Sequence, residues 1–406
     1  MSAAATTAAS PAPLPCQRHH FSLPDDFHYL NCAYMGPLPR VAEGAGIEGL
    51  RAKRFPQAIA PEDFFAPVDG LRERFARLIG EADPTRIATV PSVSYAVSTI
   101  ARNTRAGRGS NIVIVHEQFP GNVYPWRRLV AEQGGELRVV TPPGDGGEGR
   151  PRPARRGEGW TDRILARIDS GTAAVAMGTV HWTDGTRFDI EAVRARTREV
   201  GAALVLDGTQ TVGAAPIDIA ALDPDALIVA GYKWLLGPYS LSLAWFGDRY
   251  LDGVPLEETW IARRGSENFA GLVDYVDEYQ PGALRFDVGQ RSNFALIPAL
   301  SASLDLVLAW SPERVTAYCA ALMNGAFIRL RDLGVRVEDS RWRSPHLFGL
   351  GLPPDADLDR LQAALARQRV GVSFRGASVR VSPNVYNSTD DVEALVAAFE
   401  EALKGP

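Results

Sequence analysis

The chain has 406 residues, of which 46% are hydrophobic and 22% are charged, and this length allows one large domain plus a smaller one. A formal net charge of -5 excludes a general attraction to nucleic acid or anionic lipid, because such polyanions recruit basic surfaces. No stretch approaches the ~20 consecutive apolar residues of a membrane-spanning helix, and the three cysteines are too scattered for a disulfide framework or paired metal ligands. We therefore expect a cytoplasmic protein that binds neither nucleic acid nor membrane and holds no metal.

Short apolar runs alternate with longer amphipathic segments from about residue 26 onward. This alternation predicts an α/β fold in which helices flank a mostly parallel seven-stranded sheet. Strands are expected at residues 86–92, 111–117, 136–142, 172–180, 202–207, 226–231 and 240–247. Helices are expected between them at 71–79, 94–102, 125–133, 161–168 and 190–200. The Gly/Pro/Arg-rich segment 144–159 is expected to be a flexible surface loop.

The pattern changes after Gly289, which indicates a separate small α+β domain. Its expected elements are helices at 297–310, 312–333 and 390–404 and strands at 369–374 and 377–383. The predicted organisation is a disordered N-terminal extension at 1–25, an N-terminal segment at 26–60 that packs with the small domain, a large domain at 61–295 and the small C-terminal domain at 296–406. We expect the active site between the two domains, at the carboxyl ends of the strands.

One lysine stands in an apolar setting. The 43 basic residues include only three lysines, Lys53, Lys233 and Lys404. Lys233 lies between the runs ALIVAGY and WLLGP, where burial is expected to lower the pKa of its amine. Asp207 also follows an apolar strand, so both side chains should emerge at strand ends, where α/β proteins build their sites. Taken alone, either residue is more simply explained as a solvated turn residue or a helix cap.

The sequence around these two residues, VLDGTQTVGAAPIDI followed by ALIVAGYKWLLGP, resembles class V aminotransferase-family enzymes. That group includes cysteine desulfurases, kynureninases and isopenicillin N epimerase-like proteins. The resemblance extends, in the same order, to YLNCAYMGPLP (29–39), VHEQFPGNVYPW (115–126), RFDVGQRSNF (285–294) and VRVSPNVYNSTDDV (379–392). It implies fold type I, an amino-acid substrate and pyridoxal 5'-phosphate (PLP) as the cofactor.

The same resemblance implies roles for the residues around the cofactor. Lys233 would form a Schiff base with the PLP aldehyde, and Asp207 would keep the ring nitrogen protonated. Gln210 matches the residue that hydrogen-bonds the ring hydroxyl, although a polar residue in a first helical turn explains it equally well. Phe119 matches the residue that stacks on the ring, and Tyr232 resembles the phosphate-binding tyrosine of kynureninases.

The phosphate is expected at the start of a helix, where backbone N–H groups converge. Ser92, Val93 and Ser94 occupy such a position after a strand, although Ser92 could be only a helix N-cap. Gly289 and Gln290 resemble the turn that reaches the phosphate of the neighbouring subunit. The resemblance therefore implies a homodimer whose active sites lie at the subunit interface.

Arg380 matches the family arginine that clamps the α-carboxylate of the substrate with its two-pronged guanidinium. Asn31, Tyr34 and Arg375 lie in segments that flank the entrance in relatives and are expected on the substrate side. His181 is a candidate catalytic acid/base or substrate contact, and an ordinary polar loop histidine is an equally good interpretation.

The reaction implied by the resemblance begins with an external aldimine of the amino acid, from which Lys233 removes the Cα proton. We predict an aminotransferase-family enzyme, with a C–S or Cβ–Cγ lyase, an epimerase and a catalytically inactive binding protein as alternatives. A cysteine desulfurase is rejected, because the segment 371–378 lacks the nucleophilic cysteine that such an enzyme needs.

Overall fold

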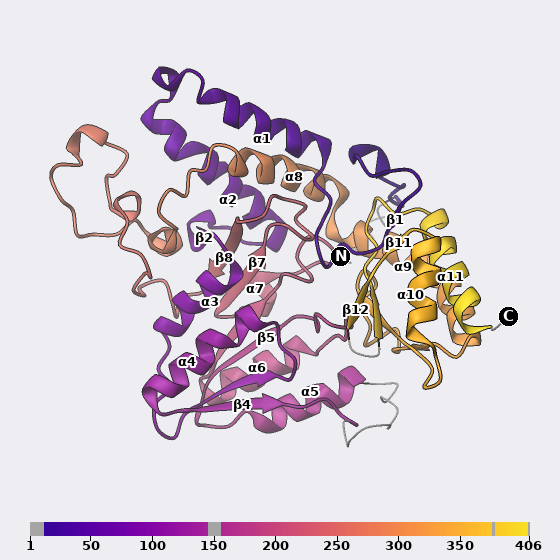
Figure 1. The fold of residues 1–406 in the computed structure, drawn as a ribbon. Coiled ribbons are helices and arrows are strands. Elements are labelled where there is room, and N and C mark those ends of the chain that lie inside the picture. The colour runs from indigo at the N-terminus through magenta and orange to yellow at the C-terminus, as the bar shows by residue number, and fades with distance from the viewer. Residues whose placement is uncertain (1–11, 145–155, 376–377, 405–406) are drawn as a thin grey trace, which may run out of the picture.

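The computed structural model describes residues 12–144, 156–375 and 378–404, which build a central sheet of seven strands (Figure 1). The strands are β2 (Ile87–Val90), β3 (Asn111–Val115), β4 (Glu136–Val140), β5 (Thr172–Gly178), β6 (Ala203–Asp207), β7 (Ala226–Ala230) and β8 (Ser242–Phe246). Their order is β2-β8-β7-β6-β5-β3-β4, and β8 alone among them runs antiparallel to its neighbours. The predicted α/β fold with a mostly parallel sheet is confirmed.

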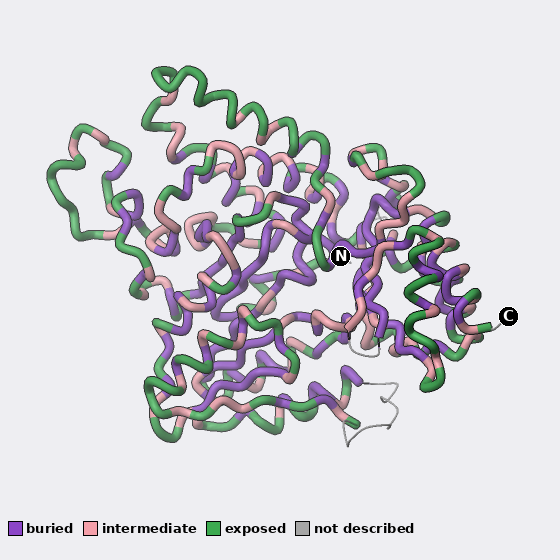
Figure 2. The backbone as a smooth tube through the Cα atoms, in the orientation of Figure 1, coloured by how far each residue is buried: buried purple, intermediate pink, exposed green. Residues whose placement is uncertain are grey.

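Side chains that alternate along the strands bury both faces of this sheet. On β6, Leu204 and Leu206 join the core cluster formed with helices on one face, whereas Ala203 and Val205 join the cluster on the other. The first face is covered by α2 (Ala66–Ile79), α5 (Arg156–Arg167), α6 (Ile190–Val200) and α8 (Leu296–Trp310). The second face is covered by α3 (Val93–Arg102) and α4 (Tyr124–Gln133). The continuous buried interior is visible as the purple tube in Figure 2.

The C-terminal part folds around an antiparallel sheet of its own. Its strands, in the order β12-β13-β10-β9, are β9 (Arg336–Val337), β10 (Phe348–Gly351), β12 (Ser373–Arg375) and β13 (Ser378–Val381). Three helices share their apolar faces with it, namely α9 (Pro312–Asp332), α10 (Leu358–Arg367) and α11 (Thr389–Leu403). The sequence analysis did not predict β9, β10 or α10.

The N-terminal segment contacts both parts of the molecule. Strand β1 (His28–Tyr29) pairs with β11 (Val370–Gly371) of the C-terminal part, and Leu30 belongs to its core. Helix α1 (Arg40–Ala52) instead runs along α8, as Figure 1 shows. The boundaries proposed for the domains remain a prediction.

Two predictions of local flexibility are wrong where the structure describes the chain. Residues 12–25 are not a disordered extension, because the buried Phe21 packs on Tyr386 with ring centroids 5.2 Å apart, and the amide of Gln17 donates to the Val385 carbonyl at 2.7 Å. Residues 156–159 of the expected loop belong to α5. There, a Cβ on Gly157 would lie 2.5 Å from the Arg187 carbonyl oxygen, so this glycine serves close packing. Residues 1–11 and 145–155 lie outside the described residues.

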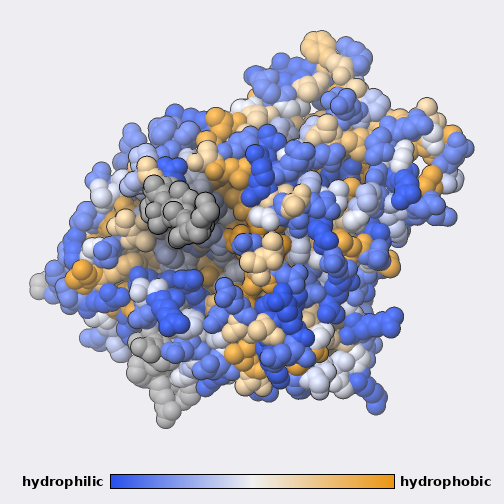
Figure 3. All heavy atoms as spheres, turned by 180° about the vertical axis from the view of Figure 1, so that it is seen from behind, coloured by the Kyte–Doolittle hydropathy of each residue, from blue (hydrophilic) through white to orange (hydrophobic). Residues whose placement is uncertain are grey.

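Within the described ranges, no helix combines the length and apolar character needed to cross a bilayer. The same residues contain no cluster of histidine, cysteine and acidic side chains that could hold a metal ion. The face of the molecule in Figure 3 is mainly hydrophilic, with hydrophobic side chains interspersed.

A buried ionic cluster fastens the edge of the central sheet. The Asp287 carboxylate pairs with the guanidinium groups of Arg72 on α2 and Arg291, and it also accepts hydrogen bonds from the amide and hydroxyl of Thr89 on β2. All of these side chains are almost inaccessible to solvent. Because breaking a buried ionic contact leaves the remaining charge uncompensated, the cluster should be sensitive to loss of Asp287, its buried carboxylate, although Arg72 also pairs with the exposed Asp69.

We predict that Asp287→Ala lowers the free energy of unfolding by about 3–5 kcal/mol, the usual effect of removing one partner of a buried ion pair. Urea denaturation of the variant and the wild type would measure this. Asp252→Ala is the matched control, because the Asp252 carboxylate is exposed and lies 3.6 Å from Arg285. Equal denaturation midpoints for all three proteins would contradict the prediction.

Candidate active site

Lys233 follows strand β7 and points into a cavity at the carboxyl ends of the parallel strands. Only 6% of the residue is exposed, and its Nζ lies 5.3 Å from the ring centroid of Phe119 and 5.5 Å from that of Tyr232. Burial lowers the pKa of the Lys233 amine to about 8, against the opposing effect of the nearby Asp207 carboxylate. The site therefore holds a lysine that is partly neutral near physiological pH.

The N-terminal segment clamps the backbone that carries this lysine. The amide of Gly36 donates to the Tyr232 carbonyl at 2.9 Å, and a Cβ on Gly36 would lie only 2.1 Å from the Lys233 carbonyl oxygen. The thiol of Cys32 also approaches that oxygen, at 3.9 Å. Glycine is needed here because the two backbones touch.

Asp207 ends strand β6 and presents its carboxylate to the same cavity. Its Oδ1 accepts a hydrogen bond from the Thr209 amide at 3.0 Å. Burial raises the pKa of this carboxyl, while the bonds from Thr209 and the charge of Lys233 oppose the rise. Lys233 and Asp207 line one cavity and make no direct ion pair, so a space remains between them.

The cavity that both residues line has a volume of about 160 Å³, and cavities of roughly 150 Å³ admit a benzene-sized ring. The predicted residues that the structure brings together around it are Ser92, Val93, Ser94, Phe119, Asp207, Gln210, Tyr232 and Lys233. An amine, a carboxylate and a flat aromatic wall around a ring-sized space fit the pyridoxal group that the sequence predicts.

Helix α3 begins at the rim of this cavity. Ser92 is its N-cap, with an Oγ that accepts a hydrogen bond from the Tyr95 amide at 3.2 Å. The positive end of the helix and the hydroxyl of Ser94 therefore face the cavity, which suits a phosphate group. The N-cap role and the predicted phosphate role of Ser92 are compatible.

The side chain of Gln210 is already held by protein groups. Its Nε2 donates to the Ala33 carbonyl at 3.2 Å, and its Oε1 accepts from the Trp234 indole at 2.9 Å. One Nε2 hydrogen remains for a ligand. Tyr232 keeps its proton, because burial raises the pKa of its phenol to about 12.

Arg380 on β13 is 1% exposed and lies beside the cavity. Its Nη1 donates to the Trp182 carbonyl at 3.0 Å, and its Nη2 donates to the Ser373 hydroxyl at 3.4 Å. The Ser373 hydroxyl in turn donates to Asn31 Oδ1 at 2.9 Å. Its Nε has no partner, and no described carboxylate pairs with it. Burial and the charge of Arg375 lower the pKa of Arg380 to about 10. This guanidinium is therefore available for an anionic ligand.

Arg375 and Tyr34 lie on the same side. The Arg375 guanidinium carbon is 5.3 Å from the ring centroid of Trp182, and its Nη1 donates to the Phe374 carbonyl at 2.7 Å. Tyr34 is exposed and close enough to Tyr232 to influence its pKa.

The structure does not bring His181 into the cavity. The imidazole is buried against Trp160, its Nε2 donates to the His116 carbonyl at 3.0 Å, and its Nδ1 pairs with the Thr183 hydroxyl at 2.6 Å. Burial lowers the pKa of His181, which favours the neutral ring. Because both ring nitrogens are used inside the protein, the geometry corresponds to the structural interpretation and not to the catalytic one.

Gly289 and Gln290 also lie apart from this cavity. The Gly289 amide donates to Glu257 Oε2 at 3.0 Å, and Gln290 adopts a left-handed conformation with φ of 59°. The roles predicted for both residues require a second subunit.

Two aromatic residues at the cavity had no predicted cofactor or substrate role. Trp182 is fixed by a bond from its indole N–H to the Glu117 carbonyl at 2.6 Å and meets Phe119 edge-on at 5.4 Å. Tyr239 is 63% exposed and lies 4.7 Å from Tyr232 between ring centroids. The sequence signal that could have identified Tyr239 as a cavity residue is its position in WLLGPY, soon after the lysine.

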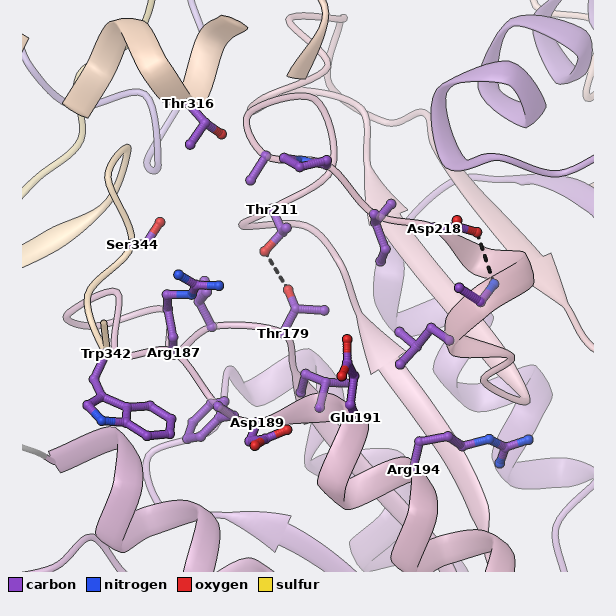
Figure 4. Close-up of a pocket in the computed structure, with 18 of the residues that line it drawn as sticks. Thr179, Arg187, Asp189, Glu191, Arg194, Thr211, Asp218, Thr316, Trp342 and Ser344 are labelled. Atoms are coloured by element: carbon purple, nitrogen blue, oxygen red, sulfur yellow. Dashed lines mark hydrogen bonds between the residues drawn. The ribbon is translucent and has the colours of Figure 1, made fainter. Parts of the chain in front are cut away.

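A larger cavity of about 790 Å³ lies elsewhere, lined by α6 and the segment 341–346 (Figure 4). Three of the charged side chains that line it, those of Arg194, Asp189 and Asp218, are engaged within the protein. Arg194 pairs with Asp223 and Asp225, and the Asp189 and Asp218 carboxylates cap helices. The smaller cavity, with its unpaired buried groups, is therefore the better candidate for catalysis.

The chain resembles known proteins over most of its length. The aminotransferase class-V family profile matches residues 60–395. A cysteine desulfurase from Enterobacter sp. (strain 638) is 24% identical over 82% of both chains, and isopenicillin N epimerase from Streptomyces clavuligerus is 26% identical over 93% of this chain and 94% of that protein.

Solved structures show the same fold. The cysteine desulfurase CsdA from Escherichia coli superimposes with a TM-score of 0.77 at 18% identity, covering 95% of this chain and 97% of that chain. The cystine C-S lyase C-DES, solved with its reaction product cysteine persulfide, gives a TM-score of 0.80 at 18% identity, covering 94% and 99%.

We predict that reductive methylation of Lys233 in the cofactor-free protein rises with pH and is half-maximal near pH 8, because only the neutral amine reacts and burial lowers its pKa. Peptide mass spectrometry would follow the reaction, with Lys53 as the internal reference for the reagent. Asp207→Asn should move the midpoint to lower pH, since it removes the charge that favours the ammonium. A midpoint close to the ordinary lysine value of about 10.4 would contradict the burial argument.

Proposed function

The chain belongs to the class-V aminotransferase family of PLP-dependent enzymes, and from that premise we propose that it is an amino-acid lyase, which removes the Cα proton and expels a leaving group from Cβ. The observation that carries the proposal is the buried Lys233 amine, with a pKa of about 8, on a ring-sized cavity that also receives the Asp207 carboxylate. An amine with a pKa near the working pH is suited to moving a proton.

The residues around the cavity would hold the cofactor as follows. Lys233 would bond its aldehyde carbon, Asp207 would pair with its ring nitrogen, and Phe119 would stack on its ring. The start of α3 at Ser92–Ser94, together with Tyr232, would bind the phosphate. When bound, PLP supplies an electron sink for the charge left at Cα as the proton departs.

The protein's own contribution is orientation and proton transfer. Arg380 would bind the α-carboxylate through guanidinium hydrogens that lack an acidic partner, and Ser373 and Asn31 hold that guanidinium in place. Lys233, released from the cofactor by the substrate amine, would take the Cα proton. The aromatic side chains of Phe119, Trp182 and Tyr232 on the walls would limit the access of water to the transfer.

Elimination is favoured over epimerisation by the bases present. Inversion at Cα requires proton delivery to the face opposite the one that lost the proton. Besides Lys233, the titratable groups in the described lining of the cavity are Asp207 and the tyrosines. In this proposal Asp207 pairs with the ring nitrogen, and burial raises the pKa of Tyr232 to about 12. Neither is therefore suited to act as the second acid/base group. An epimerase is our second candidate, because the match to isopenicillin N epimerase spans 93% of the chain.

Sulfur transfer through a cysteine of this protein is not part of the proposal. The segment 371–378 contains no cysteine, and burial raises the pKa of Cys32 to about 12 and also raises that of Cys319. The relatives reported above are desulfurases, a C–S lyase and an epimerase, and this favours the lyase over transamination.

A homodimer remains our proposal as well. Exposed apolar side chains lie on α1, including Val41 and Leu50, and on the protruding segment between β8 and α8, where Val273 and the 95% exposed Tyr275 stand (Figure 1). Apolar patches of this kind mark interaction surfaces. A second subunit bound at this surface would provide the phosphate site that Gly289 and Gln290 are predicted to reach.

We predict that Lys233→Ala abolishes covalent attachment of PLP. The wild type, mixed with PLP and reduced with borohydride, should carry a phosphopyridoxyl group on the peptide that contains Lys233, as detected by mass spectrometry. Lys53→Ala is the control and should label like the wild type. Retention of the group by the Lys233→Ala protein would refute the assignment.

A second prediction concerns products. The holoenzyme should convert β-chloro-L-alanine, whose chloride leaves readily, to equal amounts of pyruvate and ammonia without an added oxo acid. Coupled pyruvate and ammonia assays would measure both. Formation of the D-enantiomer without pyruvate would support the epimerase instead, and chloropyruvate that forms without free ammonia, and only when a second oxo acid is supplied, would support transamination.

A further inference from the structure

Two arginines, not one, face the substrate side of the cavity. Arg375 on β12 and Arg380 on β13 lie on neighbouring antiparallel strands, and their guanidinium carbons are 5.3 and 5.9 Å from the ring centroid of the same residue, Trp182. The indole is held by its bond to the Glu117 carbonyl. The two cations therefore share one rigid aromatic wall.

Neither guanidinium has an acidic partner in residues 12–144, 156–375 and 378–404. Arg375 bonds only the Phe374 carbonyl, Arg380 bonds only the Trp182 carbonyl and the Ser373 hydroxyl, and the Nε atoms of both are buried without a partner. Elsewhere in the chain, buried arginines such as Arg72 and Arg194 are paired with aspartates. Arg380 is buried and Arg375 is half-buried, and leaving such cations unpaired is costly, so this arrangement is suited to anions that arrive from outside.

The two cations also act on the reaction centre. Their positive charges contribute to the lowered pKa of Lys233, and the charge of Arg375 contributes to the lowered pKa of Arg380. Such effects require proximity, so both guanidinium groups lie within electrostatic reach of the amine. Asp207 contributes the opposing charge, and under the proposed function it is engaged by the ring nitrogen of the cofactor.

A simple amino acid brings one carboxylate to these two guanidinium groups. We propose that the substrate carries a second anionic group, a carboxylate, sulfinate or sulfonate on its side chain, which Arg375 binds while Arg380 binds the α-carboxylate. This inference rests on the proposed function of the cavity and names the substrate class for it. Trp182 forms the wall between the two contacts, and its ring face favours guanidinium groups beside it.

The alternative is that both arginines clamp a single α-carboxylate. The two arrangements differ in what loss of Arg375 does. With a separate anion site, only acidic substrates lose affinity, whereas with a shared clamp, acidic and neutral substrates weaken together.

The experiment measures dissociation constants with the holoenzyme, from the change in its visible spectrum, for L-aspartate against L-asparagine, L-glutamate against L-glutamine, and L-cysteine sulfinate against L-alanine. We expect the wild type to bind at least one acidic member about 10- to 100-fold more tightly than its neutral counterpart, as a charge-assisted contact allows. Arg375→Gln should reduce that preference to within about 2-fold without weakening the neutral compound, and Arg375→Lys should retain part of it. Arg380→Gln should weaken both members.

Arg341→Gln is the matched control, because Arg341 is an exposed arginine whose guanidinium lies 5.5 Å from a different tryptophan ring, that of Trp342. It should change no dissociation constant. A wild type that does not distinguish the acidic compounds, or an Arg375→Gln protein that weakens acidic and neutral compounds equally, would overturn the inference and leave the lyase proposal standing. If no amino acid changes the spectrum of the holoenzyme, the proposed function itself fails, and the inference fails with it.

Discussion

The site depends on keeping an amine and a carboxylate close together, largely shielded from water and not in contact with each other. Desolvation opposes the charge on both Lys233 and Asp207, and neither relieves it by a direct ion pair. The rigid sheet maintains this separation, because the two residues follow adjacent strands whose buried side chains fix their register. A ligand that places a positive ring nitrogen at one end and an aldehyde at the other would satisfy both groups at once.

Much of this arrangement follows from sequence, because its signals are strong and local. The apolar strands were recognisable by length and by β-branched residues, and the helices between them by their periodicity. Lys233 was conspicuous as a lysine in an apolar run of an arginine-rich chain. The segment around it matches a known pattern over many positions. Most residues taken from that pattern for the ring and the phosphate line one cavity, whereas Gly289 and Gln290 do not.

The features that sequence did not reveal depend on contacts between distant segments. His181 is a plausible acid/base group in the sequence, but both of its ring nitrogens are hydrogen-bonded within the protein, to the His116 carbonyl and the Thr183 hydroxyl. Gly157 resembled a loop residue, but it is a contact point for the Arg187 backbone. Phe21 lies in the segment predicted to be a disordered extension, and it is buried against Tyr386, near the other end of the chain. Short strands such as β9 were also missed, because two residues carry no periodicity.

The hydrogen bonds of the Cys32 thiol have a consequence for the order in which the site assembles during synthesis. The thiol lies between the Lys233 carbonyl, 201 positions away, and the Asn384 amide, 352 positions away. Ribosomes deliver roughly 5–20 residues per second, so the strands of the large sheet emerge many seconds before Asn384. The hydrogen bond from Asn384 to this thiol therefore forms only near the end of translation. Products that end after β8 and before residue 373 contain the strands of the large sheet but neither Arg375 nor Arg380.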